Sequence, residues 1–141
     1  MSVRSASAVW EGGLKNGNGS FSVQSGAVAG EYSFPTRFEE KPGTNPEELI
    51  GAAHAACFSM AFSAGLEAAG FIPTRVSTTA KVHLEKGAAG FSITKIELIT
   101  EAEVPGIDEA TFNQQAQGAK TGCPVSKLLT GAEIKLSAKL V

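Results

Sequence analysis

The sequence predicts an α+β fold, because strand patterns, one long helix, further strands, short helices and a last strand follow one another. Three observations carry this prediction. Segments near both ends alternate apolar and polar residues, the stretch at 48–70 has the start and stop signals of a helix, and Asn and Gly residues separate the first strands. A length of 141 residues predicts a single domain over 1–141.

The first 40 residues are expected to form strands. "SAVWEGGL" and "GSFSVQSG" flank "KNGNG", whose Asn and Gly residues suit a hairpin turn. "EYSFPTRFE" is expected to be a third extended piece, with Pro35 marking an edge or a bend.

The long helix is predicted from its ends. Asn45 can cap it, Pro46 suits the first helical position, and the helix should run to about Ala69, with Gly70 in the C′ position. Apolar residues lie nearly all round it, so we expect a central, buried helix. Its alanines and glycines would let another backbone approach closely.

The second half begins with "VSTTAKVHLEK", which alternates, and "FSITKIELITEAEV", whose change of phase between Ile93 and Ile96 predicts a bulge. Asp108 should cap a second helix through about Lys120. Gly122 then breaks the helix, "CPVSKLL" starts a short third one, and "AEIKLSAKLV" alternates as a final strand.

Charge and hydropathy limit the classes of function. Twelve basic and fourteen acidic residues leave a net charge of -2, which favours neither a nucleic-acid nor a membrane partner. No signal peptide is evident, and no uninterrupted apolar run approaches the roughly 20 residues of a membrane span. We therefore expect a cytoplasmic protein. Thiols are mostly reduced there, which disfavours a permanent disulfide and leaves a transient, catalytic one open.

The two cysteines are the main candidates for chemistry. Cys57 lies in the apolar helix, where a free cysteine is most often an inert core residue. Cys123 precedes a proline at a helix start, where the positive end of the helix dipole lowers a thiol pKa. His54 shares a helix face with Cys57, so a zinc site with Cys123 is an alternative, although structural zinc needs four ligands. The other histidine, His83, is expected to be solvated on a strand.

Arg37 and Glu47 flank the loop before the long helix. Such a pair is usually solvated and of little consequence. An arginine near a cysteine could instead hold it as a thiolate, with the carboxylate fixing the guanidinium. Local sequence leaves both interpretations open.

"TRFEEKPGTNPEELIGAAHAACFSMAFS" and "GCPVSKLL", with "VWEG" and "VPGID", resemble the OsmC/Ohr family of osmotically inducible protein C and organic hydroperoxide resistance proteins. The resemblance covers essentially the whole chain, and "HAACFSM" is similar to the OsmC branch. It implies an OsmC-like fold with two antiparallel sheet segments around a long central helix, in an intertwined homodimer.

The resemblance also implies a Cys-based peroxidase of oxidative and osmotic stress defence. It would reduce organic hydroperoxides in preference to hydrogen peroxide, without a cofactor or metal, and take its electrons from a dithiol, favourably a lipoyl-type one. Cys57 matches the cysteine that attacks the peroxide and becomes sulfenic acid. Cys123 matches the resolving cysteine that forms a disulfide with it, and Arg37 with Glu47 match the pair that activates the thiolate.

The local sequence and the resemblance disagree on which cysteine is the more reactive thiol. The helix start makes Cys123 the thiol of lower expected pKa, whereas the resemblance makes Cys57 the attacker. We follow the resemblance, because a nearby arginine can outweigh the dipole at a partly buried thiol. The alternative function is a non-catalytic stress protein that binds apolar ligands in a dimer groove.

Overall fold

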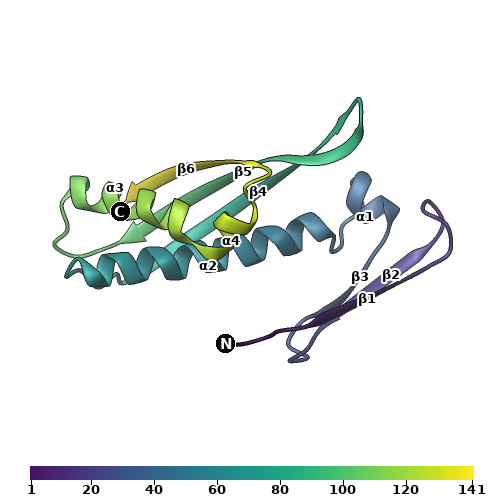
Figure 1. The fold of residues 1–141 in the computed structure, drawn as a ribbon, viewed down its shortest axis with the longest axis horizontal. Coiled ribbons are helices and arrows are strands. Elements are labelled where there is room, and N and C mark those ends of the chain that lie inside the picture. Colours follow the sequence, from purple (N-terminus) through teal and green to yellow (C-terminus); the bar gives the residue numbers. More distant parts are fainter. The chain divides into compact units, whose positions relative to one another are not determined.

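The computed structural model describes all 141 residues, and the chain divides into two compact units, Met1–Leu49 and Ile50–Val141. The first unit holds an antiparallel sheet of strands β1 (Ala6–Glu11), β2 (Asn18–Val23) and β3 (Ala29–Tyr32), in the order β1-β2-β3 (Figure 1). The hairpin predicted between the first two strands is confirmed by their antiparallel register.

The prediction of an extended segment around Pro35 is confirmed only for its first residues. The chain leaves β3 at Tyr32 and forms a short helix, α1 (Phe34–Phe38). Ser33 and Thr36 form a capping box, in which each side chain accepts a hydrogen bond from the main-chain N–H of the other. Pro35 therefore occupies the first turn of a helix, where its missing N–H costs nothing.

The predicted long helix is confirmed as α2 (Pro46–Ala68). The Glu48 N–H donates to Asn45 Oδ1 over 2.9 Å, which is the expected N-terminal cap. Gly70 follows the helix with a φ of +95°, a left-handed conformation that glycine adopts without steric cost.

The two faces of α2 differ, so the expectation of burial all round was wrong for the single chain. One stripe at helical spacing is buried, and it consists of Glu47, Gly51, His54, Phe58, Phe62 and Leu66. The opposite face is exposed and made of small or flexible apolar residues: Ala52, Ala53, Ala56, Met60 and Ala64.

The length and apolar composition of α2 would also allow a membrane span, contrary to the expectation that no segment comes close to one. Such a property is shared with core helices of soluble proteins and is weak evidence for a membrane. Phe58, Phe62 and Leu66 of the buried stripe are packed in the core of the second unit.

The second unit contains a sheet of β4 (Arg75–Gly87), β5 (Gly90–Glu103) and β6 (Glu133–Leu140), in that order. The predicted bulge is confirmed, because His83 pairs with Lys95 while the next residue, Leu84, pairs with Ile93. The expectation of antiparallel sheets was wrong for β6, which runs parallel to β5. Two helices intervene between β5 and β6, and they return the chain to the end of the sheet at which β5 begins.

Those two helices are α3 (Glu109–Gly122) and α4 (Pro124–Leu128). Asp108 caps α3 as predicted by accepting from the Thr111 N–H at 2.9 Å, and the helix continues two residues beyond Lys120. Cys123 forms both the C-terminal cap of α3 and the N-terminal cap residue of α4.

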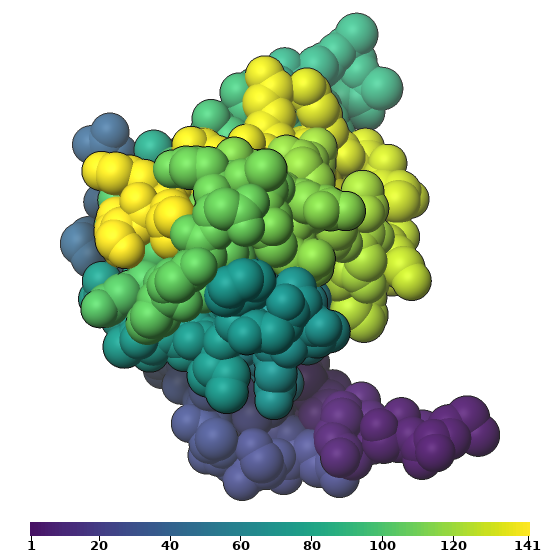
Figure 2. Space-filling view, turned by 90° about the vertical axis from the view of Figure 1, so that its left-hand side faces the viewer, coloured from purple at the N-terminus to yellow at the C-terminus, as the bar shows by residue number.

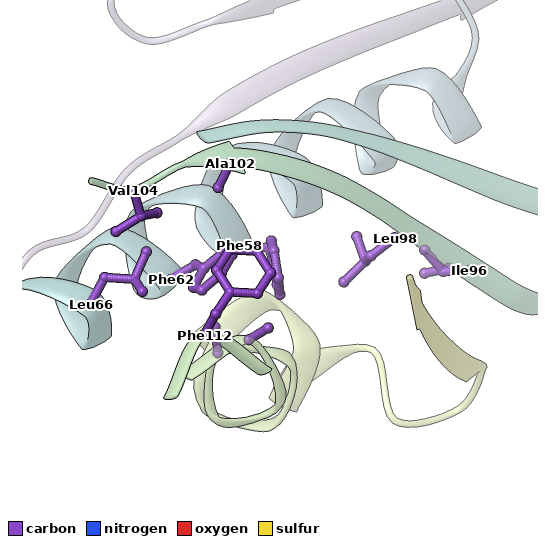
Figure 3. Packing of buried hydrophobic residues seen from close by; sticks show 10 residues of the cluster. Phe58, Phe62, Leu66, Ile96, Leu98, Ala102, Val104 and Phe112 are labelled. Carbon is purple, nitrogen blue, oxygen red and sulfur yellow. The ribbon is translucent and has the colours of Figure 1, made fainter. Parts of the chain in front are cut away.

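The core of the second unit lies between the sheet and the helices α2 and α3 (Figure 3). Phe62 lies between Phe58 and Phe112, with ring centroids 5.7 and 5.3 Å apart, and β5 contributes alternate residues such as Leu98. In the space-filling view, the green residues of α3 lie beside the teal end of α2 and the yellow C-terminal residues (Figure 2). This packing fixes the buried face of α2.

Candidate active site

The two cysteines meet in the second unit. Cys57 projects from α2, Cys123 lies between α3 and α4, and their Sγ atoms are 2.6 Å apart although the residues are 66 positions apart in sequence. Both are free thiols, and Cys123 is fully buried while Cys57 is partly exposed. A molecule in solvent therefore meets the sulfur of Cys57 first.

The surroundings shift the two thiols in opposite directions. Burial raises the pKa of the Cys57 thiol, and its hydrogen bond with Cys123 raises it further. Burial acts to raise the pKa of Cys123 as well, but hydrogen bonds from Cys57 and from the main chain and side chain of Ser126 outweigh it and lower this pKa. The hydrogen-bond donors around Cys123 therefore favour its charged form.

A buried hydrogen bond lies next to this thiol pair. His54 Nε2 and Ser126 Oγ are 2.7 Å apart and join α2 to α4, and both side chains are almost completely buried. His54 Nδ1 is buried without a hydrogen-bond partner. Burial lowers the pKa of His54, so its imidazole is neutral.

Sequence reasoning considered His54 as a neighbour of Cys57 and as a ligand of the alternative zinc site, and it missed Ser126 entirely. The available signal was that His54 lies three residues before one cysteine and Ser126 three residues after the other. The zinc alternative required the imidazole to join the sulfurs around a metal. The structure directs its Nε2 to a hydroxyl, and no group of three or more metal-ligating side chains converges.

The second predicted pair, Arg37 and Glu47, is built within the first unit. Arg37 lies in the last turn of α1 and Glu47 in the first turn of α2. The Arg37 Nη2 and Nε atoms donate to Glu47 Oε1 over 2.9 and 3.1 Å, which is a fork-shaped contact. The Asn45 side chain donates to the Thr36 carbonyl over 3.0 Å and so ties the two helix ends together.

An apolar hollow of about 220 Å³ opens beside Arg37 in the first unit. Its walls are aromatic or aliphatic apart from Arg37 and Ser33, and they consist of Trp10, Leu14, Tyr32, Phe34 and Phe38. Gly19 of β2 lies between Trp10 of β1 and Tyr32 of β3 in the sheet register. The Trp10 and Tyr32 rings meet over this glycine, which has no side chain, and their centroids are 5.5 Å apart. The three-stranded sheet thus shapes one wall of the hollow.

An α+β chain in which one accessible and one buried cysteine meet has a candidate site for two-thiol chemistry. Residues 38–139 match the family model described as OsmC-like protein, so this chain belongs to the OsmC-like family.

Relatives and solved structures agree with this assignment. The chain is 58% identical over 134 residues to "Peroxiredoxin OsmC" of Escherichia coli, covering 94% of this chain and 93% of that one. It is 36% identical over 90 residues to the "Organic hydroperoxide resistance protein" of Xanthomonas axonopodis, covering 63% and 61%. The crystal structure of the organic hydroperoxide resistance protein OhrB of Bacillus subtilis superposes with a TM-score of 0.76 at 25% identity, covering 96% and 98%.

Proposed function

We propose that this protein is a thiol-dependent peroxidase that reduces organic hydroperoxides in oxidative and osmotic stress defence. The observation that carries the proposal is the 2.6 Å approach of an accessible and a buried thiol. The names of its relatives, a peroxiredoxin and an organic hydroperoxide resistance protein, support the same class of reaction.

The accessible thiol, Cys57, is the attacker. As a thiolate it attacks the terminal oxygen of the hydroperoxide, the O–O bond breaks, and the departing alkoxide takes a proton to become the alcohol. Cys57 is left as sulfenic acid. The Cys123 thiolate then attacks this sulfur, the S–O bond breaks, and hydroxide leaves as water once protonated. A dithiol, of the lipoyl type, supplies two electrons to restore both thiols.

Activation of Cys57 needs a cation, because its own surroundings raise its pKa. Glu47 and Cys57 lie ten residues apart on the unbroken helix α2, so about 15 Å separates them along the axis. Two side chains bridge only about half of that. We assign the activating Arg37–Glu47 pair to a second copy of the chain, whose guanidinium lowers the pKa of the thiol.

The exposed face of α2 supports this homodimer. Residues such as Ala52, Ala56 and Met60 leave a smooth apolar surface. Antiparallel packing of two such helices about a two-fold axis brings Glu47 of each copy to Cys57 of the other. Each dimer then contains two sites, and each site uses both chains.

The apolar hollow beside Arg37 supports an alkyl or aryl hydroperoxide as substrate, because apolar surface gains little from hydrogen peroxide. Phe58 and Phe62 follow Cys57 closely in sequence, but they are buried in the core and do not line this hollow. We expect a higher kcat/KM for cumene or tert-butyl hydroperoxide than for hydrogen peroxide. Equal or inverted values would exclude an apolar binding site.

The reaction class is tested by counting free thiols before and after one equivalent of cumene hydroperoxide. A peroxidase of this kind loses two thiols per chain and regains them with dihydrolipoamide. No loss of thiols would support the alternative, a cytoplasmic stress protein that binds apolar ligands in a dimer groove.

A further inference from the structure

The hydrogen bond between His54 and Ser126 has no part in the proposed reaction as described so far. It lies in the core, where burying an imidazole and a hydroxyl is costly unless they are hydrogen-bonded, and the bond between them offsets that cost. Ser126 stands at the third position of α4, directly after the turn that begins at Cys123. The dyad therefore adjoins both thiols, with His54 one helical turn from Cys57 and Ser126 in the turn that follows Cys123.

The unpartnered Nδ1 atom assigns the proton of the imidazole. A proton on Nδ1 would be a buried donor without an acceptor, which costs more than an unpaired acceptor lone pair. The proton therefore resides on Nε2, and Nε2–H donates to Ser126 Oγ over 2.7 Å. The Ser126 hydroxyl, having accepted one bond, is free to donate its own proton.

We propose that His54 and Ser126 are positioning residues that direct a hydroxyl proton at the Cys123 sulfur and so hold this sulfur as a thiolate. Ser126 makes the contact, and His54 fixes the rotation of its hydroxyl. The lowered pKa of Cys123, to which the Ser126 side chain contributes, agrees with this arrangement. The catalytic meaning of the dyad rests on the proposed peroxidase function, but the arrangement itself does not.

Cys57 on α2 is the other titratable group that faces Cys123 directly, and its hydrogen bond also lowers the pKa of Cys123. The effect of the dyad therefore has to be measured in a chain that lacks this thiol. Lys120 of α3 is half-buried and Lys127 of α4 is exposed, and both line a shallow hollow on the surface. On β6, the nearby charged residues Glu133 and Lys135 are exposed.

The dyad acts twice in the proposed cycle. It increases the thiolate fraction of Cys123 when this residue attacks the sulfenic acid. After disulfide formation, a thiolate of the dithiol reductant attacks the sulfur of the partly exposed Cys57 and forms a mixed disulfide with it. The Cys57–Cys123 bond breaks in this step, and Cys123 leaves as a thiolate with the electron pair. A leaving thiol of low pKa departs faster, so the same hydrogen bond assists reduction.

The test uses the Cys57→Ser chain, in which Cys123 is the only thiol and no peroxide chemistry occurs. The ultraviolet absorbance of the thiolate is followed against pH, so no reagent has to reach the buried sulfur. Ser126→Ala should reduce the thiolate fraction at a given pH about tenfold, since a hydrogen bond to a charged group is lost. His54→Phe should lower the thiolate fraction by a smaller factor. His54→Gln keeps a hydrogen-bond donor, so it should retain most of the thiolate fraction of the Cys57→Ser chain.

Ser59→Ala is the matched control, because Ser59 also lies on α2 and its hydroxyl donates to Thr78 over 2.8 Å, away from the thiols. Ser59→Ala should leave the thiolate fraction of Cys123 unchanged at each pH. An unchanged titration in Ser126→Ala would overturn the proposal, even if His54→Phe failed to fold. In the chain with both cysteines, Ser126→Ala should slow disulfide formation about threefold, because higher nucleophilicity offsets part of the lost thiolate.

Discussion

The thiol pair and the charge pair are built in different ways. Cys57 and Cys123 come from positions 66 residues apart, and the core of the second unit brings them together. Arg37 and Glu47 are ten residues apart, at the ends of adjoining helices in the first unit. The first pair depends on the whole packed core, whereas the second depends on one loop.

Each pair joins a buried residue to a more exposed one. Cys123 is fully buried beside the partly exposed Cys57, and the Glu47 side chain keeps 11% of its surface beside the 36% of Arg37. A buried thiol is shielded from solvent oxidants and reacts only with its neighbour. A half-exposed guanidinium gains little from its own carboxylate and remains able to interact with a further group. Under the proposed function, the thiol pair carries the chemistry and the charge pair of a second copy adjusts it.

The largest expected effect comes from breaking the thiol pair. Cys57→Ser should abolish peroxide reduction, because a hydroxyl is far less ionised than a thiol. Cys123→Ser should consume about one peroxide per chain and then stall, leaving Cys57 as sulfenic or over-oxidised acid in a mass spectrum. Inability of Cys123→Ser to react with peroxide would reverse the two roles, in line with the pKa directions of the single chain.

Local signals made much of the fold predictable. Asn45 and Asp108 cap their helices through side-chain oxygens, and the change of phase on β5 marks its bulge, because each depends on residues within a few positions. The capping box of α1 was missed because Thr36 replaces the usual Glu or Gln, and Pro35 also suits an edge. The direction of β6 is set by the intervening helices and not by its own pattern.

The site was predictable only in part. The residues alone identified the two cysteines as candidates, and the family resemblance, not any local pattern, paired Cys57 with Cys123. The bond between His54 and Ser126 links residues 72 positions apart and involves types that are common in proteins. Only the packing of α4 against α2 reveals it.

A smaller effect is expected from separating the two pairs onto different chains. Cys57→Ala and Glu47→Ala homodimers should each be nearly inactive. A mixed dimer with one chain of each kind regains one complete combination, if Glu47 of one copy serves Cys57 of the other. We therefore expect about half of the wild-type activity from differently tagged, co-purified chains.

The control for subunit exchange is the mixed dimer of wild-type and Cys57→Ala chains, which should also retain half of the activity. An inactive Cys57→Ala and Glu47→Ala mixture would mean that each site is built within one chain. Such a result would remove the second copy from the mechanism and leave the thiol chemistry standing.

The smallest expected effect is on stability. Replacing both members of the charge pair, as Arg37→Met with Glu47→Gln, conserves approximate volume and leaves no unpaired charge. Arg37 is partly exposed, Glu47 is buried, and both charges are removed together, so no buried charge is left unpaired. The free energy of unfolding in urea should therefore change by less than about 1 kcal/mol. Activity measured on the same samples should be almost completely lost. A loss of stability of about 3 kcal/mol or more would mean that the pair holds the fold together, and the inactivity of its variants would then say nothing about activation of Cys57.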